Sequence, residues 1–261
     1  MFTGGGPVDA FKNMFGFLFG KTNELEKPIF TKPYIDKTYD MLELARRLDK
    51  APEESKPLFR GAMESMAAKI KAHQKVNDLL ANSEMPILIM YDLHLLCAAG
   101  SANIDYVVLT NRFIAAVSCP SQEDHLTAQE SRAMSAPGEQ RIQPSSEHSA
   151  YILAEILKSE HLISKKNLSM IWPLTVPAEI LSDAAFGDPL ESFPSSFSQN
   201  YPEVHRNQTV KPEDFIKQIK QLFQMDEAFC WLTNNELFAI SKTLLTYEAA
   251  SESTCDAETK G

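Results

Sequence analysis

Apolar residues recur at helical spacing in the first third of the chain. Between Tyr39 and Leu48, and again from about Lys56 to Leu80, an apolar side chain returns every three or four positions. This spacing places the side chains on one side of a helix, so we expect two helices that are separated near Pro52. The apolar stripe of the second helix moves to a rotated face toward its end.

After Asn82 the pattern changes to that of β-strands. The segments Ile87–Leu95, Ile104–Leu109 and Phe113–Ser118 are rich in β-branched and aromatic residues and are separated by turn residues. Three such segments joined by short turns are typical of an antiparallel meander. We therefore expect three adjacent strands in one sheet.

The second half of the chain combines helices, a further strand and two irregular segments at 120–146 and 181–208. The expected elements are a helix at Ser146–Ser159, a strand at Leu168–Val176, a short strand at Thr209-Val210, and helices at about Pro212–Gln224 and Asn234–Tyr247. Thr233 and Glu236 form a capping box before the last helix. Residues 120–146 cannot bury enough apolar area to offset the entropy of ordering them, so we expect them to be mobile. The order of elements indicates an α/β fold with a mixed sheet.

The chain of 261 residues has the length of one large domain or of one domain with additions. We expect a lead-in at residues 1–33, an α/β domain at 34–248 and a flexible tail at 249–261. Within the domain, the core spans about residues 69–176 and the helical C-terminal part spans 212–247.

Charge and cysteine content restrict the possible functions. The sequence has 25 basic and 35 acidic residues, a formal net charge of −10. This balance favours a protein partner over broad nucleic-acid binding, which depends on neutralising phosphates, but it leaves room for a local basic groove. Four widely spaced cysteines without a CxxC pair indicate neither a zinc site nor a disulfide framework, and we expect a reducing, cytoplasmic setting. The apolar patch Met14–Phe19 is too short and too glycine-broken to span a membrane, so no membrane span is expected.

One carboxylate interrupts the apolar hairpin of the expected meander. Asp105 lies in the first of two apolar runs, and the second run ends at Cys119 without a charged residue. The surrounding sequence, YDLHLLCAAGSANIDYVVLTNRFIAAVSC, resembles the central hairpin of nuclease-related domains, the NERD family of the PD-(D/E)XK superfamily, whose members carry an IDHVVI…GIFVIEVKN pattern there. The preceding helix and the later LSMIWPLTVP segment follow in the expected order. The resemblance covers roughly Lys69 to Val176 and implies a restriction-endonuclease-like core.

The resemblance also implies a set of catalytic positions. Phosphodiester hydrolysis in such a fold uses a divalent cation held by carboxylates, and a lysine that stabilises the developing charge. A three-residue loop at Thr110–Arg112 pairs Asp105 with Val117 across the hairpin. Asp105 then corresponds to the first acid of the family, Val117 to its glutamate and Cys119 to its lysine. The family's Asn-Pro-x-x-Gln motif reads Gln143–Glu147 here.

Of the family's catalytic positions, Asp105 alone is matched, because the helical Gly-Glu motif has no counterpart near His73. One carboxylate is a poor Mg²⁺ site. We therefore expect a degenerate nuclease site, no cofactor and a non-catalytic binding or regulatory role. A structural subunit that docks through the Phe-rich N-terminus and the 181–208 insertion is a further possibility.

The alternative is a Mg²⁺-dependent DNA nuclease with a rearranged site. In that case Asp92, Glu147 or Glu155 supplies the missing acid, and Lys158 or Lys165 replaces the missing lysine.

Simple structural roles are also possible for these residues. Asp105 can be a buried acid held by backbone N–H groups or by His94. Cys119 is expected to be a buried structural cysteine rather than a thiol nucleophile activated by His125 or His148.

Overall fold

The computed structural model describes residues 25–120, 146–177, 207–224 and 232–258. Their centre is a six-stranded mixed sheet whose strands lie side by side in chain order. The strands are β1 (Ile29–Lys32), β2 (Leu88–Cys97), β3 (Gly100–Leu109), β4 (Ile114–Ser118), β5 (Ile171–Thr175) and β6 (Gln208–Thr209). Strands β2, β3 and β4 form an antiparallel meander, to which β1, β5 and β6 add by parallel pairing.

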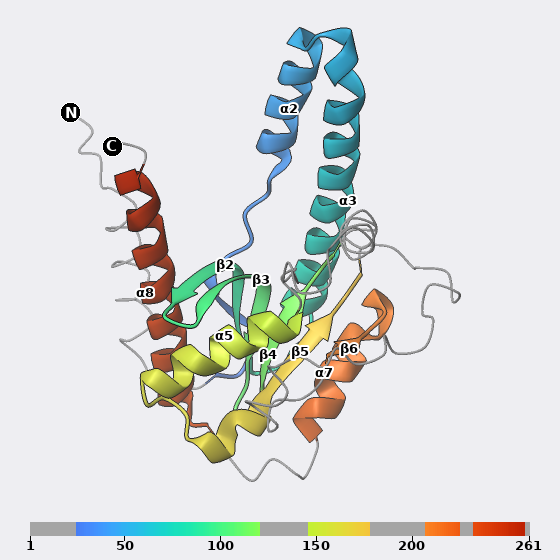
Figure 1. Ribbon diagram of the computed structural model, residues 1–261. Coiled ribbons are helices and arrows are strands. Elements are labelled where there is room, and N and C mark those ends of the chain that lie inside the picture. Colours follow the sequence, from blue (N-terminus) through green and yellow to red (C-terminus); the bar gives the residue numbers. More distant parts are fainter. Residues whose placement is uncertain (1–24, 121–145, 178–206, 225–231, 259–261) are drawn as a thin grey trace, which may run out of the picture.

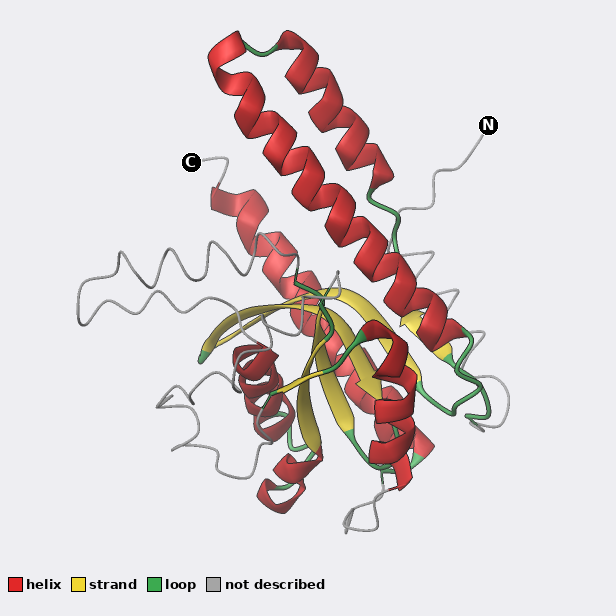
Figure 2. Cartoon of the chain, turned by 90° about the vertical axis from the view of Figure 1, so that its right-hand side faces the viewer, coloured by secondary structure: helices red, strands yellow, loops and turns green. Residues whose placement is uncertain are grey.

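Helices cover both faces of the sheet and produce three layers (Figures 1 and 2). The helices are α2 (Thr38–Lys50), α3 (Lys56–Ala81), α5 (Ser146–Ser159), α7 (Phe215–Gln224) and α8 (Asn234–Glu258), with 3₁₀ turns at Glu53–Ser55, Lys165–Met170 and Pro212–Asp214. The apolar residues of α5 and α8 form one core cluster with the sheet, and those of α3 and α7 form the other. We call the two sides of the sheet the α5/α8 face and the α3/α7 face.

The expected α/β class, mixed sheet and central meander are confirmed. The capping box is also present, because Thr233 Oγ1 accepts the Glu236 N–H at 3.3 Å and Glu236 Oε2 accepts the Thr233 N–H at 2.7 Å. Strand β1 falls within residues 1–33, which the sequence indicated only as a lead-in. Helix α8 continues to Glu258, beyond its expected end at Tyr247. The expectations for residues 121–145 and 181–206 lie outside the described residues.

Helices α2 and α3 form a hairpin that projects from the sheet, as Figure 1 shows. No residue of α2 is buried, and the buried residues of α3 are confined to its last three turns, at Ala72, His73, Val76 and Leu80. His73 is therefore a polar residue on an otherwise apolar contact between α3 and the sheet.

Within the described ranges, no helix is both long enough and apolar enough to cross a membrane.

Candidate functional site

The side chains of strand β3 change faces of the sheet at Asp105. In a regular strand, residues i and i+2 point to the same face of the sheet. Here Ile104 packs on the α5/α8 face, whereas Tyr106, two residues later, packs on the α3/α7 face. The alternation is therefore interrupted between them, at Asp105.

Strand β2 changes in the same way at the position directly opposite. Tyr91 packs on the α3/α7 face and Leu93 on the α5/α8 face, and Asp92 between them has a positive φ of 53°. The pairs on either side, Tyr91 with Tyr106 and Leu93 with Ile104, place Asp92 across from Asp105. A left-handed backbone is uncommon outside glycine, although Asp is among the residues that tolerate it. Two acids thus mark the irregularity in the sheet.

The expected pairing of Asp105 with Val117 is wrong by one residue. Val117 pairs with Tyr106 instead. The reason is the turn, which contains four residues rather than three: Thr110 N–H donates to the Phe113 carbonyl at 2.9 Å, and Thr110 Oγ1 accepts the Phe113 N–H at 2.9 Å. A side-chain hydrogen bond of this kind extends a turn.

The carboxylate of Asp105 is nevertheless beside Cys119 and the helix α3. Its Oδ2 accepts the backbone N–H of Cys119 at 2.6 Å. Its Oδ1 lies 3.3 Å from His73 Nε2 and 3.9 Å from Lys69 Nζ. Burial alone would raise the pKa of Asp105, but the contact with His73, the charge of Lys69 and the Cys119 N–H outweigh it, and the pKa lies below its usual range. Asp105 is therefore ionised at neutral pH.

Two tyrosines hold His73 in position. Tyr91 Oη lies 2.9 Å from His73 Nδ1, and Tyr106 Oη donates to the His73 carbonyl at 2.6 Å. Burial raises the pKa of both phenols far above the usual range, so both stay protonated. The other ring nitrogen, Nε2, is buried, faces Asp105 and makes no well-aligned hydrogen bond with a described residue.

Cys119 completes the cluster. Its side chain is buried, and burial together with the negative charge of Asp105 raises the pKa of the thiol well above its usual range. A protonated, buried thiol is a poor nucleophile. Of the two histidines weighed as activators of a thiol nucleophile, His148 bonds the Ser101 carbonyl at 2.9 Å, and His125 lies outside the described residues. The imidazole beside Cys119 is that of His73.

The candidate substitute acids have other partners. Asp92 pairs with Lys37 at 2.7 Å and lies 3.6 Å from His94. Glu147 Oε1 accepts the Asn207 N–H at 3.0 Å. In the described part of the chain, the one group of three or more potential metal ligands contains neither acid.

Of the remaining candidates, neither Glu155 nor Lys158 contributes to the cluster of described residues around Asp105. Glu155 and Lys158 pair with each other at 3.4 Å, and nothing is described of the side chain of Lys165. His94, a possible partner of Asp105, contacts Asn103 and Asp92 instead.

The sequence analysis did not assign His73 or Tyr91 to the site, and only His73 had a signal in the sequence. His73, Val76 and Leu80 share one stripe of α3, and this helical spacing would have indicated that the histidine faces the sheet. Nothing in the pattern pointed to Tyr91 as its partner, because an aromatic residue in a buried strand is ordinarily core.

Comparisons of the chain with protein-family models, with curated proteins and with solved structures found no match.

Proposed function

We propose that the protein is a non-catalytic binding module with a degenerate, NERD-like nuclease site. The order of α3, the meander β2–β4, α5 and the parallel strand β5 agrees with the order that the sequence resemblance implies. This agreement supports the proposed restriction-endonuclease-like core, and the chemistry of the cluster around Asp105 supports the proposed loss of activity.

The observation on which the proposal depends is the occupation of the Asp105 carboxylate by protein groups. Oδ2 accepts the Cys119 N–H, and Oδ1 faces His73 and Lys69. Mg²⁺ prefers oxygen ligands, and this cluster offers one carboxylate, one imidazole and one thiol. Val117, at the position of the family's glutamate, is apolar and fully buried. The donor set does not fit Mg²⁺, so we derive no catalytic step through that ion.

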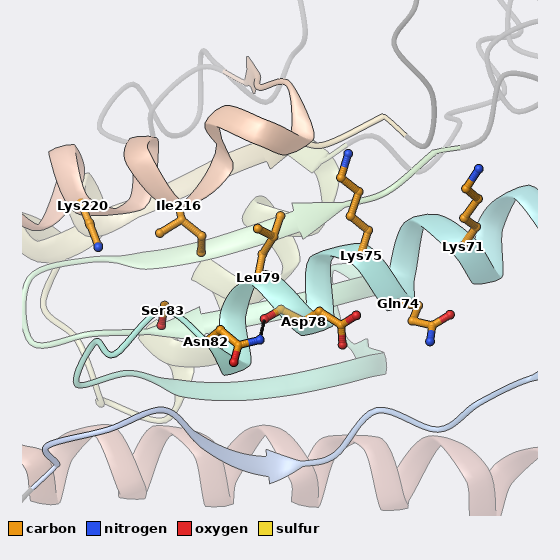
Figure 3. A pocket seen from close by; sticks show the side chains of 9 residues that line it. All are labelled: Lys71, Gln74, Lys75, Asp78, Leu79, Asn82, Ser83, Ile216 and Lys220. Atoms are coloured by element: carbon orange, nitrogen blue, oxygen red, sulfur yellow. Dashed lines mark hydrogen bonds between the residues drawn. The ribbon is translucent and has the colours of Figure 1, made fainter.

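A groove between α3 and α7 offers a surface for a binding partner. Figure 3 shows Lys71 and Lys75 on α3 with their amines pointing the same way, and Lys220 on α7. The groove has a volume of about 540 Å³, and among the described residues that line it Asp78 is the one acid. Three lysines in a protein of net charge −10 create a local positive potential. This surface suits an acidic segment of a partner protein.

The test of the proposal is a cleavage assay on single- and double-stranded DNA with Mg²⁺ or Mn²⁺. The proposal predicts no cleavage above the level of the isosteric variant Asp105→Asn. Cleavage that this variant abolishes would establish the nuclease instead.

One observation favours the nuclease alternative. Lys69 Nζ lies 3.9 Å from Asp105 Oδ1, so a helix supplies a lysine beside the acid. In a rearranged site this amine could stabilise charge on a phosphate. If the alternative holds, the native chain cleaves DNA, and Lys69→Met abolishes this cleavage as completely as Asp105→Asn does. Our proposal predicts instead that the native chain does not cleave DNA.

A further inference from the structure

Three potential metal ligands from different elements meet under α3. His73 Nε2 comes from α3, a carboxylate oxygen of Asp105 from β3, and Cys119 Sγ from the residue after β4. These atoms all lie within 4.8 Å of one another. His73 and Cys119 are buried, and Asp105 is mostly buried. The wide spacing of the cysteines in the sequence indicated no zinc site, but the fold brings a thiol, an imidazole and a carboxylate together.

We propose that His73, Asp105 and Cys119 bind Zn²⁺ with three protein ligands. Zinc accepts sulfur, nitrogen and oxygen donors, which distinguishes it from Mg²⁺. Zinc–ligand bonds of about 2.0–2.3 Å put the donors of a tetrahedral site roughly 3.3–3.8 Å apart. Donors within 4.8 Å of one another therefore need to approach by at most about 1–1.5 Å, which side-chain rotations can supply.

The hydrogen bonds around the three ligands resemble those that orient the ligands of a metal site. The contact of Tyr91 Oη with Nδ1 orients the His73 ring so that Nε2 points to Asp105. The Cys119 N–H holds one oxygen of Asp105 and leaves the other facing the cluster. Such hydrogen bonds behind the ligands fix their orientation. The buried Nε2, which makes no well-aligned hydrogen bond with any residue that the structure describes, gains a ligand bond when the metal enters.

Two groups weaken the binding of zinc at this site. The Cys119 thiol must lose its proton, so zinc binding releases a proton at this residue. The Lys69 amine lies 3.9 Å from Asp105, but its side chain is 48% exposed and can turn to solvent. Its charge weakens cation binding without preventing it. A bound zinc ion would join α3 to the middle of β3 and to the end of β4, and a fourth position would hold water.

The experiment uses the full chain, stripped of metal with a chelator and then titrated with ZnCl₂. We expect about one zinc per chain and a melting temperature that rises by on the order of 5 °C at saturating zinc. MgCl₂ should leave the melting temperature unchanged. Replacement by Co²⁺ should give the near-ultraviolet absorption of a cobalt–thiolate bond, because Cys119 supplies the sulfur.

Matched variants locate the site. His73→Gln and Cys119→Ser should each lower zinc affinity at least tenfold, and Cys119→Ser should remove the cobalt–thiolate band. The controls are Cys97→Ser and His94→Gln, which change the same residue types outside the cluster and should bind zinc like the native chain. Unchanged affinity in the cluster variants would overturn the proposal.

A third variant keeps the test decisive if the buried substitutions prevent folding. Lys69→Met removes the competing amine from a half-exposed position and leaves all three ligands in place. We expect it to tighten zinc binding several-fold. Failure of the native chain to bind zinc, or an affinity that Lys69→Met leaves unchanged, contradicts the assignment. Neither result bears on DNA cleavage, so this proposal and the proposed function can fail separately.

Discussion

The Asp105 carboxylate and the His73 imidazole meet where α3 packs on β3, with Oδ1 3.3 Å from Nε2. This contact joins a helix to the sheet at the point where β2 and β3 reverse their alternation. An acid that the proposed NERD-like resemblance relates to nuclease chemistry is thus engaged by the protein's own groups. The question for experiment is whether the contact serves stability, metal binding or catalysis.

Removing the Asp105 carboxylate should destabilise the fold. Asp105→Ala removes the acceptor of the Cys119 N–H and the negative charge that faces His73 Nε2, and a buried donor left unsatisfied costs about 1–3 kcal/mol, more when a charged partner is lost. We expect the free energy of unfolding in urea to fall by about 2–3 kcal/mol. Asp92→Asn is the control: its ion pair with Lys37 is part-exposed, and Asn tolerates a positive φ, so the loss should stay below about 1 kcal/mol. Equal losses would contradict a special role for Asp105.

The stability contributed by Asp105 should depend on pH in the acid range. Its pKa is lowered in the folded protein, so the unfolded chain binds the proton more readily. The stabilisation is present above the unfolded pKa of about 4 and disappears as the pH falls through the lower folded value. The difference in unfolding free energy between the native chain and Asp105→Asn should therefore be constant from pH 7 to 5 and shrink below pH 4. A difference that grows toward low pH would contradict the direction of the pKa shift.

The four-residue turn between β3 and β4 should depend on Thr110. Its buried hydroxyl accepts the N–H groups of Arg112 and Phe113 at 3.1 and 2.9 Å. Thr110→Val keeps the shape of the side chain and removes this acceptor, so unfolding should become easier by about 1–3 kcal/mol. Thr246→Val is the control, because that hydroxyl is exposed and bonds its own helix. An unchanged free energy of unfolding in Thr110→Val would mean that the turn keeps its register without the Thr110 hydroxyl.

The groove between α3 and α7 should select acidic peptides. We expect a polyglutamate peptide to bind the native chain, and the double variant Lys71→Glu/Lys75→Glu to lose that binding by tenfold or more at low salt. Lys50→Glu/Lys242→Glu carries the same charge change on α2 and α8 and should retain binding. Binding of a single-stranded oligonucleotide in preference to polyglutamate would favour a nucleic-acid partner.

Helical spacing of apolar residues was sufficient to place α3 and α5, and the β-branched and aromatic segments after Asn82 were sufficient to place the meander. Strand β1 was missed because its four residues, between Pro28 and Pro33, are too short to show alternation. The register of β3 and β4 was missed because the hydroxyl of Thr110 sets the turn length, which apolar spacing does not record.

The composition of the candidate site was harder to predict than the fold. Asp105 and Cys119 could be singled out because they interrupt or end apolar strands. The association of His73 with them requires the reversal of alternation at Asp92 and Asp105, which brings the carboxylate to the α3/α7 face. A period-two pattern assumes a regular strand, so the sequence alone does not show that the carboxylate of Asp105 faces α3.

DNA cleavage by the native chain, compared with Asp105→Asn, is the most direct measurement of whether the nuclease site is degenerate. The assay contains single- or double-stranded DNA with Mg²⁺ or Mn²⁺, and circular dichroism verifies that both proteins are folded. Losing one group that stabilises the transition state typically costs about 10²–10³ in rate, and in the proposed NERD-like assignment Val117 and Cys119 occupy the positions of two such groups. We predict that the two proteins are equally inactive. Cleavage by the native chain that disappears in folded Asp105→Asn would contradict the non-catalytic assignment.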